Sequence, residues 1–339
     1  MNAAVQVAIH PSQFPENVRR DLLASLRARR VNHKFHYDSV KQTQKWLALH
    51  QVHSPSRNDI DCAAIYDRAF AGAVKQIAAK RVHVLGLGCG GGQKDMRLLK
   101  LLKSRGKEVL YTPSDVSVAM TLVARKAALK ILPTENCFPF VCDLATTGDF
   151  GDMVESISCT GGRPQGPQRP APSAQRLITF FGMIPNFEPQ MILPKLSALV
   201  RRSDWLLFSA NLAPGADYAA GVKKILPQYD NALTRDWLTT FLFDLGVARN
   251  TGELRFQIET VAKTGLKRVA ADFHFRRAQR ITVEDETFAF RAGESIRLFF
   301  SYRYTPERVQ KILARYGLEV RQQWITDSEE EGVFLCRRK

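Results

Sequence analysis

The stretch Arg81-Val-His-Val-Leu-Gly-Leu-Gly-Cys-Gly-Gly-Gly-Gln-Lys94 decides the fold. Its first half is apolar and alternates only weakly, as expected of a parallel strand that is buried on both faces. A glycine-rich turn follows, and the leucines between Met96 and Lys103 then recur at helical spacing. Glycines between a strand and a helix let backbone N–H groups approach a cofactor closely. A glycine turn alone would serve NAD or FAD equally well, or be a plain tight turn.

Strand and helix patterns continue to alternate along the chain. We expect helices over 15–80 and 118–131, and we expect further strands over 108–115, 138–143, 175–182 and 205–211. Such alternation favours a parallel sheet with right-handed crossovers, which is a Rossmann-like α/β domain.

The character of the sequence changes after residue 213. Residues 221–249 have a helical pattern, 255–301 alternate as in antiparallel strands, and a helix is expected over 305–317. The predicted organisation is an N-terminal helical part of a substrate lobe (1–80), a cofactor-binding domain (81–215) and a C-terminal substrate-binding region with the last sheet elements (216–339). A Pro- and Gly-rich stretch within 160–175 is expected to be a flexible surface insertion.

Composition narrows the class of protein. The chain has 339 residues, of which 45% are hydrophobic, and it contains no apolar run long enough to cross a bilayer and no secretory signal pattern. None of its 6 cysteines belongs to a CxxC pair, so we expect no metal site and reduced thiols in a cytoplasmic protein. The net charge of +16 is spread over scattered basic residues. It favours a solvated basic surface, and a nucleic-acid partner stays an open alternative. The oligomeric state cannot be deduced from the sequence.

Two carboxylates stand where the second and third predicted strands end. Asp115 can accept hydrogen bonds from ribose hydroxyls, and Asp143 suits the exocyclic amine of adenine, with Leu144 against the ring. Either carboxylate alone could be a helix N-cap. Together with the glycine turn they outline a crevice for an adenosyl group, which favours S-adenosylmethionine over NAD.

These motifs resemble a specific family. Three segments are similar to the cofactor motifs of the histidine N-alpha-methyltransferases of ergothioneine biosynthesis, whose relatives include fungal dimethylallyltryptophan N-methyltransferases. The segments are Leu85-Gly-Leu-Gly-Cys-Gly-Gly-Gly-Gln-Lys94, Tyr111-Thr-Pro-Ser-Asp-Val-Ser117 and Cys142-Asp-Leu144. The resemblance extends from about residue 32 to the C-terminus. It implies that S-adenosyl-L-methionine is the cofactor and S-adenosyl-L-homocysteine the product. The residues it assigns to the cofactor are Gly86, Gly88, Lys94, Asp115, Asp143 and Leu144.

The resemblance also implies a substrate site for an amino acid. Tyr37 would lie near the substrate amine and relay its proton through water, while Asn186 and Tyr229 would hold the carboxylate; these three are the candidate catalytic residues. The complete set of implied substrate-binding residues is Tyr37, Gly182, Asn186, Tyr229, Phe299 and Ser301.

The departures from the family pattern concern the substrate side chain. Phe299 stands where the histidine enzymes carry a glutamate that grips the imidazole, and Ala271 aligns with a bulky methionine. The family's Tyr-Tyr-Pro-Thr-Arg segment reads His53-Ser-Pro-Ser-Arg57. We therefore predict an N-methyltransferase for a small-molecule amine, an amino acid or its derivative, with a side chain larger or more apolar than histidine.

Other interpretations stay open from the sequence. Phe299 could be a core residue, Asn186 a loop or capping residue, and Tyr229 a packing tyrosine. A nucleic-acid methyltransferase, a basic binding protein, and a non-catalytic relative that kept the cofactor fold are the alternative functions.

Overall fold

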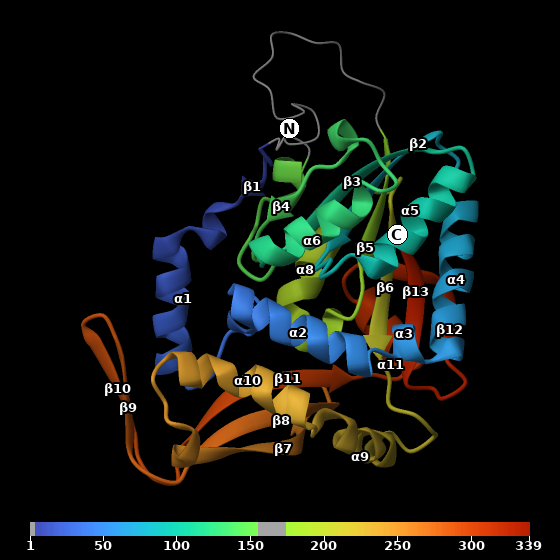
Figure 1. Ribbon diagram of the computed structural model, residues 1–339. Helices are drawn as coiled ribbons and strands as arrows, with labels where there is room; N and C mark the ends of the chain where they lie inside the picture. The colour runs from blue at the N-terminus through green and yellow to red at the C-terminus, as the bar shows by residue number, and fades with distance from the viewer. Residues whose placement is uncertain (1–3, 155–173) are drawn as a thin grey trace.

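The computed structural model describes residues 4–154 and 174–339. Its largest element is an eight-stranded sheet (Figure 1). In spatial order its strands are β1 (Ala8–Ile9), β4 (Phe140–Val141), β3 (Glu108–Asp115), β2 (Arg81–Leu87), β5 (Gln175–Phe180), β6 (Trp205–Asn211), β13 (Glu331–Arg338) and β12 (Leu318–Ile325).

The order of these strands identifies the fold. From β1 to β6 all neighbours pair in parallel, whereas β13 is antiparallel to both β6 and β12. The strand order reverses at β2, so a crevice is expected beyond the carboxyl ends of β2 and its neighbours. This arrangement confirms the predicted Rossmann-like α/β fold.

Helices cover both faces of the sheet because its strands are apolar on both sides. Val82 and Val84 of β2 pack in the cluster that contains α4 and α5, whereas Leu85 and Leu87 belong to the cluster on the opposite face. The helices are α1 (Pro15–Arg27), α2 (Val40–His53), α3 (Pro55–Asn58), α4 (Ile60–Lys75), α5 (Gln93–Ser104), α6 (Val118–Ala128), α8 (Pro189–Leu199), α9 (Tyr218–Tyr229), α10 (Ala232–Asp244) and α11 (Pro306–Ala314).

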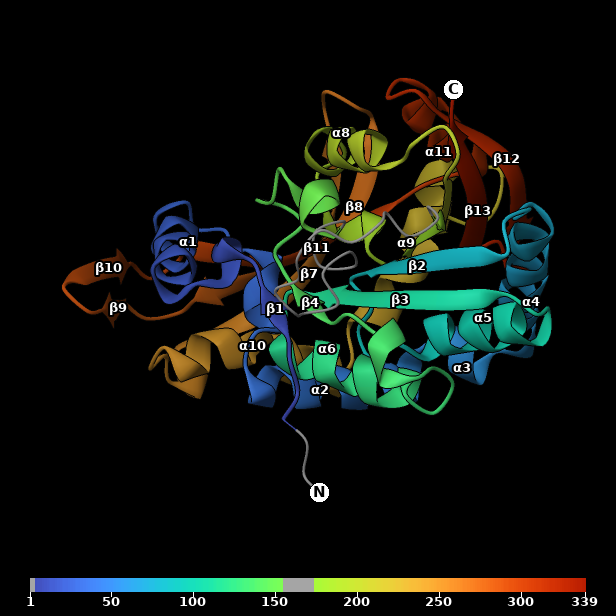
Figure 2. The same ribbon diagram turned by 90° about the horizontal axis from the view of Figure 1, so that it is seen from above.

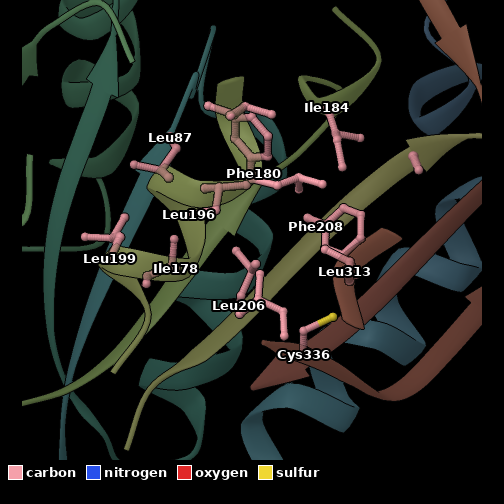
Figure 3. Close-up of a cluster of buried hydrophobic side chains, with 14 of the residues drawn as sticks. Leu87, Ile178, Phe180, Ile184, Leu196, Leu199, Leu206, Phe208, Leu313 and Cys336 are labelled. Atoms are coloured by element: carbon pink, nitrogen blue, oxygen red, sulfur yellow. The ribbon is translucent and has the colours of Figure 1, made fainter. Parts of the chain in front are cut away.

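The apolar cluster that contains Leu85 and Leu87 joins the sheet to α8 and α11. Phe180 and Phe208, from neighbouring strands, lie with Leu196 of α8 and Leu313 of α11 (Figure 3), and all four are at most 3% exposed. Full burial of a side chain of this size contributes about 1.5–3 kcal/mol. This cluster anchors the sheet that carries the glycine turn.

A second lobe is inserted between β6 and β12. Its three-stranded antiparallel sheet consists of β7 (Gly252–Val261), β8 (Leu266–Phe275) and β11 (Ser295–Arg303). The hairpin of β9 (Gln279–Val283) and β10 (Glu286–Phe290) projects away from the body of the molecule (Figures 1 and 2). Helix α10 of this lobe packs against α2 from the N-terminal part. Segments from both ends of the chain thus form the wall that faces the Rossmann-like sheet.

Most predicted elements are present but several differ in extent, and the region 15–80 forms four separate α-helices. The strand expected over 138–143 is limited to Phe140–Val141, and the helix expected over 221–249 is split where the Asn231 side chain accepts a hydrogen bond from the N–H of Thr234 and starts α10. The short strand β1 was not expected within 1–80. Of the predicted insertion, residues 160–173 lie outside the described residues, and β5 begins at Gln175. The division into these three domains stays a prediction.

Candidate functional site

The glycine turn takes a conformation that only glycine adopts easily. Gly88 and Gly90 have φ of +58° and +52°. A Cβ on Gly88 would lie 2.7 Å from Met183 Cγ, and one on Gly90 would lie 3.0 Å from the ring of Trp46. Glycine is therefore needed both for the positive φ and for the close approach of the neighbouring segments.

Asp115 connects the end of β3 to this turn. Its carboxylate accepts a hydrogen bond from the Gly90 N–H at 2.9 Å and another from the Ser117 N–H at 3.0 Å. Burial raises the pKa of Asp115, while the backbone N–H groups oppose that rise. Each carboxylate oxygen has a second lone pair. The carboxylate can thus hold the loop and still accept hydrogen bonds from a diol such as ribose.

Asp143 carries an unused acceptor at the same edge of the sheet. Its Oδ1 accepts the Ala145 N–H at 2.8 Å, but its buried Oδ2 has no hydrogen-bond partner among the described residues. The Lys34 ammonium lies 3.6 Å from Oδ2, and burial raises the pKa of this carboxyl. A buried acceptor of this kind calls for a donor. The exocyclic amine of adenine would satisfy it, so the residues present fit S-adenosylmethionine.

Lys94 is held by residues from two distant elements. Its Nζ donates to Tyr66 Oη of α4 at 2.7 Å and lies 3.8 Å from Glu331 of β13, to which the Tyr66 hydroxyl also donates. The ammonium also lies above the Tyr66 ring. Lys94 lines the cavity described below, where its charge can face a carboxylate.

Gly86 has a different place from the other predicted cofactor residues. It does not line the cavity; a Cβ there would lie only 2.4 Å from Asp95 Oδ2. Asp95 is a buried acid that we did not predict, and it accepts hydrogen bonds from Tyr111 and Thr179 at 2.7 and 2.8 Å. Burial raises the pKa of Asp95 to about 6. In the sequence it reads as an ordinary acid in the first turn of a helix.

One cavity, of about 280 Å³, lies between the cofactor residues and the N-terminal segment 32–50. Its volume is close to the lower end of the usual range for ligand pockets. The predicted site residues on its wall are Tyr37, Gly88, Lys94, Asp115, Asp143, Leu144, Gly182 and Asn186. The predicted residues that do not line it are Gly86, Tyr229, Phe299 and Ser301.

Tyr37 is enclosed by aromatic side chains. Its ring centroid lies 6.1 Å from that of Trp46 and 5.5 Å from that of Trp237. Burial and the nearby Asp115 carboxylate raise the pKa of Tyr37. The phenol therefore stays protonated near neutral pH and can donate a hydrogen bond.

Gly182 and Asn186 form the opposite wall. Gly182 has φ of +70°, and its N–H donates to Ser209 Oγ at 2.9 Å. Its amide is therefore already used, which leaves its carbonyl for a ligand. Asn186 ends a short 3-10 helix, Ile184–Asn186, that packs against β11 and β6.

Tyr229, Phe299 and Ser301 lie together behind the cavity. The Tyr229 hydroxyl donates to Ser301 Oγ at 2.9 Å, and the Tyr229 and Phe299 ring centroids are 6.2 Å apart. Phe299 is 7% exposed and pairs directly across the sheet with Ala271. The two side-chain departures from the family pattern thus face each other across neighbouring strands.

Two histidines on the cavity wall were missed by sequence reasoning. His33 has both ring nitrogens buried without hydrogen-bond partners among the described residues, and its ring lies 5.2 Å from that of Phe299. His50 stacks on Trp46 at 4.7 Å, and its Nδ1 is likewise unpartnered within the described chain. Burial lowers the pKa of both, to about 3 for His50. Both are neutral imidazoles that can accept hydrogen bonds, and nothing in their local sequence marks them.

Other site types find little support. Within residues 4–154 and 174–339, no group of three or more His, Cys, Asp or Glu side chains could hold a metal ion. No described helix is long and apolar enough to cross a membrane. The free thiols that the structure describes are those of Cys62, Cys89, Cys137, Cys142 and Cys336.

Comparison with known proteins identifies related chains. The model of a family described as histidine-specific, S-adenosylmethionine-dependent methyltransferase matches residues 18–338. N-methyltransferase imqF of Aspergillus flavus is 24% identical over 258 residues, which are 74% of this chain and 66% of that protein. This chain thus covers slightly less than two thirds of that relative.

Solved structures are similar at a lower level. A S-adenosylmethionine-dependent methyltransferase from Clostridium acetobutylicum has a TM-score of 0.44 at 12% identity, with 87% of this chain and 98% of that chain covered. Magnesium protoporphyrin IX methyltransferase from Synechocystis has a TM-score of 0.42 at 13% identity, with 95% and 98% covered. These scores are low, and the fold assignment rests on the strand order.

Proposed function

Because this chain belongs to the family of histidine-specific, S-adenosylmethionine-dependent methyltransferases, we propose that it methylates the amino group of an amino acid or an amino-acid-derived small molecule. The chain is an S-adenosylmethionine-dependent methyltransferase, and S-adenosylmethionine is its cofactor. The proposed substrate has a side chain larger or more apolar than that of histidine. The free thiols support a reducing, cytoplasmic setting.

The observation that carries the proposal is a cavity lined by both the Rossmann-like domain and the N-terminal segment 32–50. Gly88, Asp115 and Asp143 line its cofactor side, while Tyr37 and Asn186 line the side that faces the second lobe. When bound, S-adenosylmethionine supplies an activated methyl group for transfer to a nucleophile. Holding the reacting groups in line can contribute roughly 7–11 kcal/mol to catalysis. The contribution of this chain is therefore mainly to orient an amine toward the cofactor side.

Part of the cavity wall is uncharged. An ammonium must lose its proton before its nitrogen can attack. The wall offers neutral His33 and His50 and a Tyr37 phenol that can donate but does not carry negative charge. We infer that the proton leaves the substrate by way of water next to Tyr37.

The proposed side-chain preference rests on what surrounds Phe299. Its ring contacts Tyr229, Trp237 and His33, and the opposing residue on β8 is the small Ala271. Phe299 does not line the cavity itself but packs behind His33, which does, and aromatic pairing adds about 0.5–1.5 kcal/mol beyond the buried area. A cationic or strongly polar side chain would find no carboxylate at this position.

The lysines of the described residues that line the cavity are not free cations. Both are engaged by protein carboxylates: Lys34 pairs with Asp21 at 2.6 Å, and Lys94 lies 3.8 Å from Glu331. A nucleic-acid methyltransferase would instead need free cations leading to the cofactor. This difference favours the small-molecule substrate.

The test is direct methyl transfer by the purified chain. We would incubate it with S-adenosylmethionine and histidine, tryptophan, tyrosine, phenylalanine or leucine, each next to its decarboxylated amine, and identify N-methylated products by mass spectrometry. We expect a bulky apolar amino acid to be the best of the panel, with Asn186→Ala impaired and the exposed control Asn250→Ala unchanged. Methylation of RNA or DNA without methylation of any amino acid would overturn the proposal.

A further inference from the structure

Arg303 at the end of β11 is a buried cation that pairs with no carboxylate of the described residues. It is 6% exposed, and its Nη1 donates to the carbonyls of Leu212 and Glu330 at 3.2 and 3.4 Å. Its Nη2 donates to Tyr229 Oη at 2.9 Å, whereas its Nε is buried without a hydrogen-bond partner among the described residues. No carboxylate of the described chain forms an ion pair with it.

The other buried arginine of the described residues is neutralised. Arg176 is 5% exposed, and its Nε donates to the Asp204 carboxylate at 2.9 Å. Arg297, which is only partly buried and lies on the same strand as Arg303, is likewise held by Asp272 and Glu259. An unpaired buried charge is unfavourable unless an anion compensates it. The contrast indicates that the anion for Arg303 comes from outside the protein.

A chain of hydrogen bonds leads from Arg303 to a free donor. Arg303 donates to Tyr229, and Tyr229 donates to Ser301 Oγ at 2.9 Å. Asn211 Nδ2 also donates to Ser301 Oγ, at 3.4 Å. Both acceptor positions of Ser301 are therefore filled, and its own O–H is not donated to any described group. Hydrogen bonds in such a chain polarise one another, so the guanidinium makes the Ser301 hydroxyl a better donor.

This chain of residues adjoins the cavity. Tyr229 contacts Phe299, and Phe299 contacts His33 on the cavity wall. The short helix that carries Asn186 packs against β11, the strand of both Ser301 and Arg303. The hydrogen-bond chain therefore ends on the strand that packs against the cavity wall at Asn186.

We propose that Arg303 is a positioning residue that supplies the positive charge for the substrate carboxylate, acting through Tyr229 and Ser301. The inference rests on the proposed function and deepens it, because it requires the substrate to be an acid as well as an amine. Arg303 also fills an acceptor position of the Tyr229 hydroxyl, whose own hydrogen is donated to Ser301 Oγ.

The experiment compares an amino acid with its own decarboxylated amine. For wild type, Arg303→Gln, Arg303→Lys and the exposed control Arg255→Gln, we would measure kcat and KM for tryptophan and tryptamine, or for the best acid–amine pair of the panel above. We expect wild type to prefer the acid. We expect Arg303→Gln to lower this preference about ten- to hundredfold, mostly by raising KM for the acid, because a hydrogen bond to a charged group contributes that much to binding. Arg303→Lys should keep part of the preference, and Arg255→Gln all of it.

Two further measurements separate a binding role from a structural one. Tyr229→Phe breaks the hydrogen-bond chain but keeps the guanidinium, and it should lower the preference for the acid as Arg303→Gln does. Affinity for S-adenosylhomocysteine, measured by calorimetry, should stay within twofold of wild type in both variants.

The outcomes distinguish the two proposals. If Arg303→Gln binds S-adenosylhomocysteine normally and keeps the wild-type preference for the acid, this inference is wrong while the proposed function stands. If wild type methylates no member of the panel, and calorimetry with S-adenosylhomocysteine present detects binding of none, the proposed function is wrong and this inference with it.

Discussion

The strongest test of the cofactor site is Asp115→Ala, because one carboxylate supports both the loop and the ligand. The substitution removes the acceptor of the Gly90 N–H at 2.9 Å and of the Ser117 N–H at 3.0 Å, in a side chain that is only 9% exposed. Leaving a buried donor unpaired costs about 1–3 kcal/mol. The two donors together predict a loss of roughly 2–6 kcal/mol in the free energy of unfolding.

The effect on the ligand is separate. A hydrogen bond to a charged group is worth about 1.5–3 kcal/mol, so losing the ribose contact should weaken binding roughly ten- to 150-fold. Isothermal titration with S-adenosylhomocysteine measures this loss, and urea denaturation measures the loss of stability. The matched control is Asp149→Ala, a 56% exposed carboxylate that pairs with His10. It should change stability by no more than about 0.5 kcal/mol.

Each half of the prediction can fail alone. A folded Asp115→Ala protein with wild-type affinity for S-adenosylhomocysteine would refute the ribose assignment. A variant with wild-type stability would refute the claim that this carboxylate holds the glycine turn.

Three other changes have defined outcomes. Phe299→Glu should raise activity on histidine relative to leucine in the methylation assay, and an unaltered substrate profile would count against the side-chain pocket. It should also lower the free energy of unfolding by about 3–5 kcal/mol, because it buries a carboxylate without a basic partner. The pKa of Asp95, raised to about 6, implies that its ionised form is disfavoured in the folded state. The protonated Asp95 carboxyl therefore stabilises the fold below the ordinary carboxyl pKa, and this stabilisation is lost as the pH rises through about 6. Between pH 4 and 7 the free energy of unfolding of wild type should fall by roughly 3 kcal/mol relative to that of Asp95→Asn, as measured by urea denaturation. Parallel profiles of the two proteins would contradict this. Gly86→Ala should lower both the melting temperature and the affinity for S-adenosylhomocysteine, because its Cβ would lie 2.4 Å from Asp95 Oδ2. Gly148→Ala is the control, since a Cβ there meets nothing within 4 Å. Equal melting temperatures of the two variants would refute the steric argument.

The sequence by itself determined the Rossmann-like domain and the neighbourhood of the cofactor residues. Strand β2, its glycine turn and helix α5 follow from local periodicity, and the strands before Asp115 and Asp143 run parallel to β2. The carboxyl ends of parallel strands meet at one edge, so motifs far apart in the chain were expected to lie together. That reasoning did not reach Tyr37 and Asn186, because their local patterns carry no periodic signal. These two residues were predicted only from the family resemblance.

Only the tertiary structure decided which polar groups are left without partners. Glu331 reaches Lys94 through Tyr66, and Arg303 reaches Ser301 through Tyr229, across long stretches of chain. Hydrogen bonds of this kind depend on the register of the strands and on how the helices pack, and the local sequence predicts neither. Burial has the same origin: the charge state of a group such as Asp95 is set by neighbours that folding brings around it, so its chemistry is a property of the folded chain.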